Sequence, residues 1–203
     1  EKSAAIFGED NSTLTNKGTI NLEDKESGGI LAKDSNVTNS GSASKIYVKE
    51  ESSVGIDATL TGSTLSPAVT LTGDKVAKNE GLIELQTNAK TSAAIIGKRE
   101  TGSTKKLTIE NVGTATSSAT LDIKSTESVG INDTNGIIEL KNKKTAGIIA
   151  TKSSKVTNKG NITLTGPTGG ITASGNGLVG VSLAGSELTN ENTITMNTAF
   201  STG

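Results

Sequence analysis

Two nearly identical nine-residue peptides lie far apart in this chain: "LTNKGTINL" at 14–22 and "VTNKGNITL" at 156–164. Looser copies of the same phrase, an apolar residue followed by Thr, Asn, any residue and Gly, lie between and after them. Their Asn anchors are Asn16, Asn39, Asn79, Asn111, Asn158 and Asn190, with a contracted copy at Asn135-Gly136. Successive anchors are 23, 40, 32, 24, 23 and 32 residues apart. A base period of about 23 residues, lengthened by insertions, indicates a repeat architecture.

A second phrase alternates with the first and reads small, Ile, any residue, small. Its copies span Ala4–Gly8, Gly28–Ala32, Val54–Ala58, Ala93–Gly97, Val129–Asp133, Ala146–Ala150 and Val179–Leu183. If these copies stack, one inward column contains Ile6, Ile30, Ile56, Ile95, Ile131, Ile148 and Val181. The residue before each of them forms a column with nothing larger than Ala: Ala5, Gly29, Gly55, Ala94, Gly130, Gly147 and Gly180.

The small column allows two interpretations. Strict alternation would turn it outward and make a flat, partly apolar face that includes Phe7, Leu31, Ile96 and Ile149, mixed with Asp57, Asn132 and Ser182. Such a face would suggest a covering partner. Alternatively, a local bulge turns the column inward, where a narrow corner requires Gly.

Both phrases have the period of a β-strand. In "VTNKGNITL", Val156, Ile162 and Leu164 share one face, and Asn-Lys-Gly provides turn residues that tolerate left-handed backbone. Short β-branched strands with Gly and Asn corners, repeating every 20-odd residues, indicate a β-solenoid. We therefore predict an all-β, right-handed parallel β-helix with three strands per coil and roughly eight or nine coils, as a single unit over 1–203.

Composition excludes several chemistries. The chain has no Cys and no His, so a thiolate nucleophile, a His base and the usual zinc ligands are absent. Lys and Arg number 20 against 21 Asp and Glu, and there are two Phe, one Tyr and no Trp, so nucleic acid is not an expected partner. We expect no catalytic, cofactor or metal site and no enzyme activity.

Several motifs that could indicate a binding site also have a structural explanation. "GNGLVG" (175–180) matches G-x-G-x-x-G, but a dinucleotide site needs a helix after it, and another solenoid phrase follows. The Asn anchors are interpreted as a structural ladder of stacked amides. The most cationic stretch, "GKRETGSTKK", lies in an insertion and supplies a candidate ligand-contact loop with Lys98, Arg99, Lys105 and Lys106. The alternative for that stretch is an ordinary solvated loop.

The alternation of Asn-x-Gly phrases with GI-type phrases resembles the passenger repeats of bacterial type V autotransporters, in particular the large fusobacterial outer-membrane adhesins. The resemblance extends over nearly the whole chain. It implies a right-handed parallel β-helix exported to the cell surface and tethered in the outer membrane by a C-terminal barrel, which is not in this sequence. It also implies that 1–203 is an excerpt of a longer passenger, with no membrane contact except through that barrel.

On this basis we expect a surface-exposed adhesin segment that binds a protein or glycan of a host or bacterial surface through its loops. The candidate loops are Thr59–Asp74, Lys98–Lys106, Gly113–Thr120 and Gly166–Gly177. Two alternatives remain: a stalk that only spaces other parts of a surface protein, and a carbohydrate-active β-helix enzyme. The enzyme would need converging carboxylates, whereas the acidic residues here stand mostly beside Lys.

Overall fold

The computed structural model describes residues 3–61, 73–86, 89, 92–99, 105–117, 121–123, 129–132, 136–140, 146–151, 155–164, 179–185 and 187–196. All regular structure within these ranges is β-strand, arranged in three seven-stranded sheets. We name them sheets A, B and C in the order in which the chain visits them.

Each sheet takes every third strand of the chain. Sheet A contains β1 (Ala4–Gly8), β4 (Gly28–Lys33), β7 (Val54–Leu60), β10 (Ala93–Arg99), β13 (Leu121–Ile123), β16 (Ala146–Thr151) and β19 (Val179–Ala184). Sheet B contains β2 (Thr13–Asn16), β5 (Asn36–Asn39), β8 (Lys75–Asn79), β11 (Leu107–Asn111), β14 (Val129–Asn132), β17 (Lys155–Asn158) and β20 (Glu187–Asn190). Sheet C contains β3 (Thr19–Leu22), β6 (Lys45–Val48), β9 (Leu82–Leu85), β12 (Thr114–Ser117), β15 (Ile137–Leu140), β18 (Asn161–Leu164) and β21 (Ile194–Met196).

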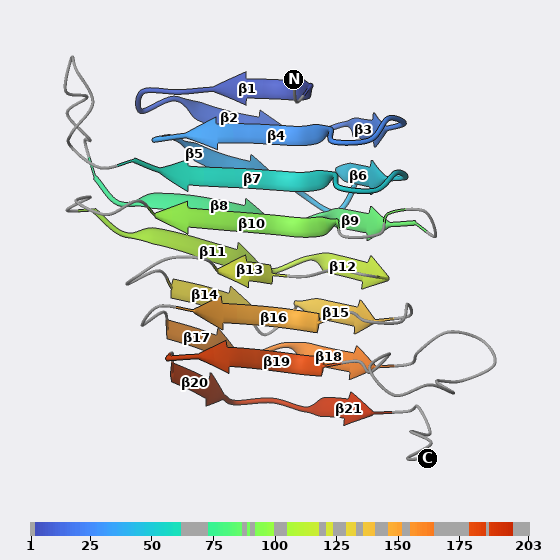
Figure 1. The fold of residues 1–203 in the computed structure, drawn as a ribbon, viewed down its shortest axis with the longest axis vertical. Helices are drawn as coiled ribbons and strands as arrows, with labels where there is room; N and C mark the ends of the chain where they lie inside the picture. The colour runs from blue at the N-terminus through green and yellow to red at the C-terminus, as the bar shows by residue number, and fades with distance from the viewer. Residues whose placement is uncertain are drawn as a thin grey trace.

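One strand from each sheet makes one coil, and every strand pairs in parallel with its counterpart in the next coil. In Figure 1 the sheet A strands lie in front and run to the left, while those of sheets B and C lie behind and run to the right, and coils descend from the N-terminus. The molecule is a right-handed parallel β-helix, which confirms the predicted fold. The described residues form seven coils, fewer than expected, because several coils exceed the base period.

Alternation along the strands fills the interior with aliphatic side chains. Wholly buried Ile residues come from all three sheets: Ile30, Ile56 and Ile95 from sheet A, Ile109 from sheet B, and Ile46, Ile83, Ile138 and Ile162 from sheet C. Fully burying such a side chain contributes about 1.5–3 kcal/mol relative to leaving it exposed. No single coil encloses a core, so stacking is what removes these side chains from water.

Sheets A and B match each other in side-chain size. Gly8 of β1 faces Leu14 of β2, and Gly97 of β10 faces Ile109 of β11, each so closely that an added Cβ would collide with the larger side chain. In the coils between, the same sheet A column carries Ala32 and Ala58, and the sheet B column carries Val37 and Ala77. Where sheet A has Gly, sheet B therefore has Leu or Ile, and where sheet A has Ala, sheet B has the smaller Val or Ala.

The small-residue column turns inward. Gly29, Gly55 and Ala94 are all buried, and a Cβ built on Gly55 would lie 2.6 Å from the Ala94 carbonyl oxygen and 2.8 Å from Cγ2 of Ile83. Pairing between neighbouring strands skips this position, so three consecutive residues at the start of β4 and β7 are buried. The bulge interpretation is the correct one for these coils.

Two sequence assignments in the middle of the chain were wrong. The phrase at Val129–Asp133 was placed in the Ile column, yet Val129–Asn132 is β14 of sheet B, where Ile131 pairs with Glu110 and Thr157. Leu121 of β13 takes the position between Ile95 and Ile148 instead. The triplet Val-Gly-Ile satisfies either strand pattern, and only the count of strands per coil separates them.

The same miscount affected one candidate loop. Gly113–Thr120 was interpreted as an insertion, but Thr114–Ser117 is β12, which pairs with β9 and β15 in sheet C. A sheet C strand must lie between successive strands of sheets B and A in every coil. This segment therefore belongs to the helix wall, and three candidate loops remain.

Candidate functional site

The Asn anchors lie at the corner between sheets B and C and hydrogen-bond one another along the helix axis. The Nδ2 group of each donates to Oδ1 in the next coil: Asn16 to Asn39 (2.7 Å), Asn39 to Asn79 (2.8 Å), Asn79 to Asn111 (2.9 Å), and Asn158 to Asn190 (2.7 Å). Register places Asn132, which the sequence analysis assigned to another column, between Asn111 and Asn158. Asn135 lies outside the described residues.

These amides also satisfy the backbone of the turn. Asn79 Nδ2 donates to the carbonyl of Gly81 at 3.1 Å, and Asn111 Nδ2 does the same to Gly113 at 3.1 Å. Asn39, Asn79, Asn111 and Asn158 are wholly buried. An amide with its hydrogen bonds used inside the fold and no exposed surface is not available to an outside ligand.

A second ladder, which was not predicted from the sequence, consists of serines at the corner between sheets C and A. The amide of Ser27 donates to Ser53 Oγ and the amide of Ser53 donates to Ser92 Oγ, each at 3.1 Å. Ser92 Oγ donates in turn to the carbonyl of Glu50 at 3.1 Å. The available signal was a Ser directly before the second phrase in the first four coils, at Ser3, Ser27, Ser53 and Ser92.

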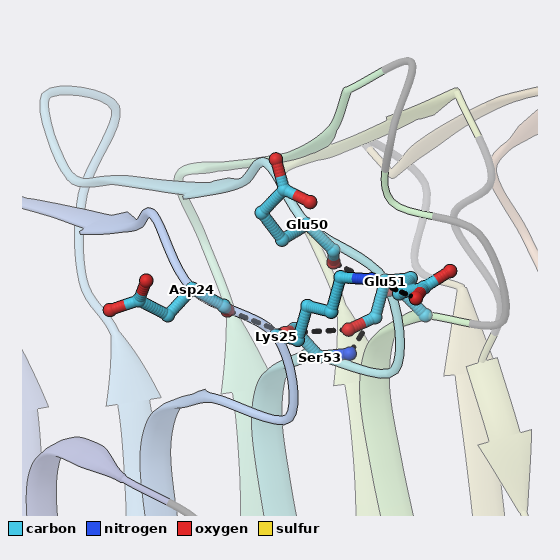
Figure 2. A network of polar contacts seen from close by, with 6 residues as sticks. Asp24, Lys25, Glu50, Glu51 and Ser53 are labelled. Carbon is cyan, nitrogen blue, oxygen red and sulfur yellow. Dashed lines mark hydrogen bonds and ion pairs between the residues drawn. The ribbon is translucent and has the colours of Figure 1, made fainter.

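Charged side chains at this corner pair between coils. Figure 2 shows Lys25 extended to Glu51 in the next coil, with Nζ 2.5 Å from Oε1, beside Glu50 and Asp24. The hydrogen bond to Glu51, reinforced by its negative charge, raises the pKa of Lys25. Lys49 reaches back to Glu23 at 2.5 Å in the same manner. These are exposed pairs, so their individual contribution to stability is small.

A further charged group lies on the outer side of sheet B. Lys78 Nζ is 3.1 Å from Glu80 Oε1 and 3.7 Å from Glu110 Oε2, and Glu80 also accepts hydrogen bonds from Ser40 Oγ and the Gly41 amide at 3.2 Å each. The hydrogen bond from Lys78, with those from Gly41 and Ser40, lowers the pKa of Glu80. Glu80 therefore connects the second coil to the third, and Lys78 continues the connection to Glu110 in the fourth.

The cationic candidates lie at the corner between sheets A and B. Lys98 and Arg99 are the last residues of β10, where they pair with Thr59 and Leu60, and the Lys98 side chain is exposed. Lys105 and Lys106 directly precede β11, and Lys106 is exposed. The Lys106 amide donates to Asp74 Oδ1 at 2.9 Å, which fixes its backbone to the coil above. Residues 100–104, between the two pairs, lie outside the described residues.

Two long connections of the first four coils arise at this corner, and the one between β7 and β8 is the longest in those coils. One joins β7 to β8 and includes 62–72 of the candidate loop Thr59–Asp74, and the other joins β10 to β11. The described residues at their bases are Thr59 to Thr61, Gly73 and Asp74, and the four cationic residues. The fourth candidate loop, Gly166–Gly177, joins sheet C to sheet A and lies outside the described residues.

This corner also contains buried polar side chains that the sequence analysis did not single out. Asp34, at positive φ between β4 and β5, is wholly buried and accepts hydrogen bonds from the Thr61 amide (2.8 Å) and the Thr61 hydroxyl (2.5 Å). Lys75 is 3% exposed and its Nζ donates to Asn11 Oδ1 at 2.8 Å. No periodic signal marks these residues, because each occurs in one coil only.

The outward column of sheet A is partly apolar in the first four coils. Phe7 is 61% exposed, and Leu31, Asp57 and Ile96 follow it in register with half-buried side chains. Asn132, expected in this column, is replaced by Asp122. Asp57 between two aliphatic residues interrupts the apolar surface.

The described residues also bear on metal binding and membrane contact. Within them, no three His, Cys, Asp or Glu side chains are placed to hold a metal ion. Nor does any described segment form a helix long and apolar enough to cross a membrane. After "GNGL" the chain enters strand β19, whereas a dinucleotide site requires a helix there.

No family model, curated protein or solved structure matches this chain. Any functional assignment therefore depends on the sequence and geometry of this chain alone.

Proposed function

We propose that this chain is a segment of a surface-exposed adhesin of the type V autotransporter kind, a rod that holds binding loops at one corner. The observation that carries the proposal is the corner between sheets A and B. Two adjacent coils there carry long connections, and exposed Lys98 and Lys106 stand at the base of the second. A rigid stack that presents neighbouring loops is suited to binding an extended surface ligand.

The charges at this corner favour an anionic partner. Lys98 and Lys106 are exposed there, and Lys105 directly precedes Lys106 on the same connection. Sulfated or sialylated glycans, or an acidic protein surface of a host or bacterial cell, offer the complementary charge. The proposed mechanism is binding without catalysis, at the cell surface.

The experiment compares two loop replacements in the purified chain. Exchanging 62–72 and 100–104 together for short Gly-Ser linkers should abolish binding to cultured epithelial cells and to immobilised heparin or sialylated glycan. Exchanging 165–178, which arises at the corner between sheets C and A, is the control and should preserve binding. Circular dichroism verifies that both variants keep their strand content.

A charge reversal refines this test. Lys98→Glu combined with Lys106→Glu should weaken heparin binding at least about tenfold, equivalent to about 1.4 kcal/mol. Lys17→Glu with Lys45→Glu makes the same change in net charge away from this corner, because Lys17 belongs to the B–C corner and Lys45 to sheet C. Equal loss in both double variants would indicate a nonspecific charge effect and contradict the proposed site.

A stalk without a ligand is the second candidate function. It is favoured by the inter-coil ion pairs, since most described surface charges at the C–A corner and on sheet B are used to connect coils. The loop replacements separate the two functions. A stalk predicts that the wild-type chain binds neither cells nor glycans and that neither replacement changes this.

A further inference from the structure

The corner between sheets A and B contains a lysine amine directly against a side-chain amide. Lys75 Nζ lies 2.8 Å from Asn11 Oδ1, and the two residues are 64 positions apart in the sequence. Asn11 precedes β2 in the first coil and Lys75 begins β8 in the third, so the Lys75 side chain crosses the level of the second coil. Two coil steps span about 10 Å, which requires the side chain to run along the helix axis.

The surroundings of this contact resemble a reaction site more than a surface hydrogen bond. Lys75 is 3% exposed, and among the described residues it takes part in none of the ion pairs within 4.0 Å. Burying an ammonium group with a neutral amide as its partner is energetically costly. Conversion of the pair to a secondary amide would remove that charge from the interior.

Asn11, whose side-chain amide faces Lys75, is held in place by a backbone hydrogen bond. The backbone N–H of Asn11 donates to the backbone carbonyl of Asp34 at 2.9 Å, and the backbone φ of Asn11 is 67°. The Asp34 carboxylate, wholly buried and bonded to Thr61, belongs to the same corner in the intervening coil. The corner thus combines an amine nucleophile, a carboxamide and a carboxylate, the groups that amide exchange employs.

We propose that Lys75 and Asn11 form an intramolecular isopeptide bond. The Lys75 nitrogen bonds to Cγ of Asn11, the Cγ–Nδ2 bond breaks, and Nδ2 departs as ammonia, which carries the surplus protons of the lysine ammonium away as an ammonium ion. No oxidant or cofactor is required. The bond ties the first coil to the third and is independent of the adhesin proposal, because it needs no external ligand.

Intact-mass spectrometry of the purified, denatured chain tests this proposal. The wild-type mass should be lower than the sequence mass by one ammonia, and Lys75→Arg or Asn11→Ala should restore the full mass. Lys78→Arg is the matched control in the same strand and should keep the loss. A protease digest of the wild type should contain one branched peptide that joins the segments around positions 11 and 75.

Two results would overturn it. One is a wild-type chain with its full sequence mass. The other is an ammonia loss that persists in Lys75→Arg, which would show that Asn11 has cyclised onto the amide of Ser12 to a succinimide. The branched peptide is sought in the wild type alone, so the test does not depend on whether a variant folds.

Discussion

At the scale of single residues, the corner between sheets B and C explains why Asn recurs. An amide side chain has both a donor and an acceptor, so one residue can accept from the coil before it and donate to the coil after it. Asn39 and Asn79 do both, and Asn79 also donates to the turn at Gly81. Asp has no donor and Ala has neither group, so each would leave buried partners unsatisfied.

Asn79→Ala should lower the free energy of unfolding by about 2–3 kcal/mol, because it leaves buried amide and carbonyl groups of Asn39, Asn111 and Gly81 unpaired. Urea denaturation followed by circular dichroism measures the change. Asn190→Ala should cost less, since Asn190 is exposed in the last described coil and, within the ladder, its removal breaks only the hydrogen bond from Asn158. Equal destabilisation by the two variants would contradict a ladder whose strength depends on burial.

Glu80 predicts an acid-sensitive connection between coils. Its pKa is lowered in the folded state, chiefly by the hydrogen bond from Lys78, so its stabilising contribution is present above the unfolded pKa and is lost as pH falls through the folded pKa. Glu80→Gln should be slightly less stable than wild type near pH 7, by at most about 1 kcal/mol. The difference should vanish in strong acid, and thermal melts across the pH range measure it. A pH-independent difference would refute the role of the charge.

At the scale of elements, strand geometry depends on where alternation is interrupted. The small column at the start of β4, β7 and β10 lies inward beside the β-branched residues Ile46 and Ile83 of sheet C. The sequence showed that the column tolerates nothing larger than Ala, but the direction of the column follows from the skipped pairing. Alternation of apolar and polar side chains cannot indicate a bulge at a Gly, because Gly has no side chain whose polarity shows which face it lies on.

Gly55→Ala should destabilise the protein by about 1–3 kcal/mol through overpacking, because its Cβ would crowd backbone that cannot move independently. Gly18→Ala, where an added Cβ meets nothing within 4 Å, is the control and should change stability little. Thermal denaturation of both variants distinguishes them. Tolerance of Ala at Gly55 would mean that the stack relaxes along its axis.

At the scale of the whole molecule, the β-helix is a one-dimensional array in which each coil covers its neighbours. Interior coils contain wholly buried side chains such as Ile56 and Ile83, whereas Leu188 and Ile194 of the last described coil are only partly buried. The stability of a coil therefore depends on its place in the stack.

Hydrogen exchange should reveal this gradient. Backbone amides of β5 and β8 should exchange at least about tenfold more slowly than those of β20 and β21, because local opening requires less exposure of apolar surface at an end. Mass spectrometry of peptic fragments measures the rates. Uniform protection along the chain would instead indicate a single cooperative unit.

The repeat, the parallel β-helix and the Asn corner are predictable from the amino-acid pattern alone, because these depend on local features that every coil must reproduce: strand period, turn residues and a fixed spacing. It misplaced Val129–Asn132 and Thr114–Ser117, since a short apolar or Thr-rich segment fits more than one wall of the coil. The strand count of each coil, the inward turn of the small column and the contact of Lys75 with Asn11 become visible in the folded molecule alone. Those features arise from contacts between coils, where residues far apart in the chain become neighbours without leaving a periodic trace.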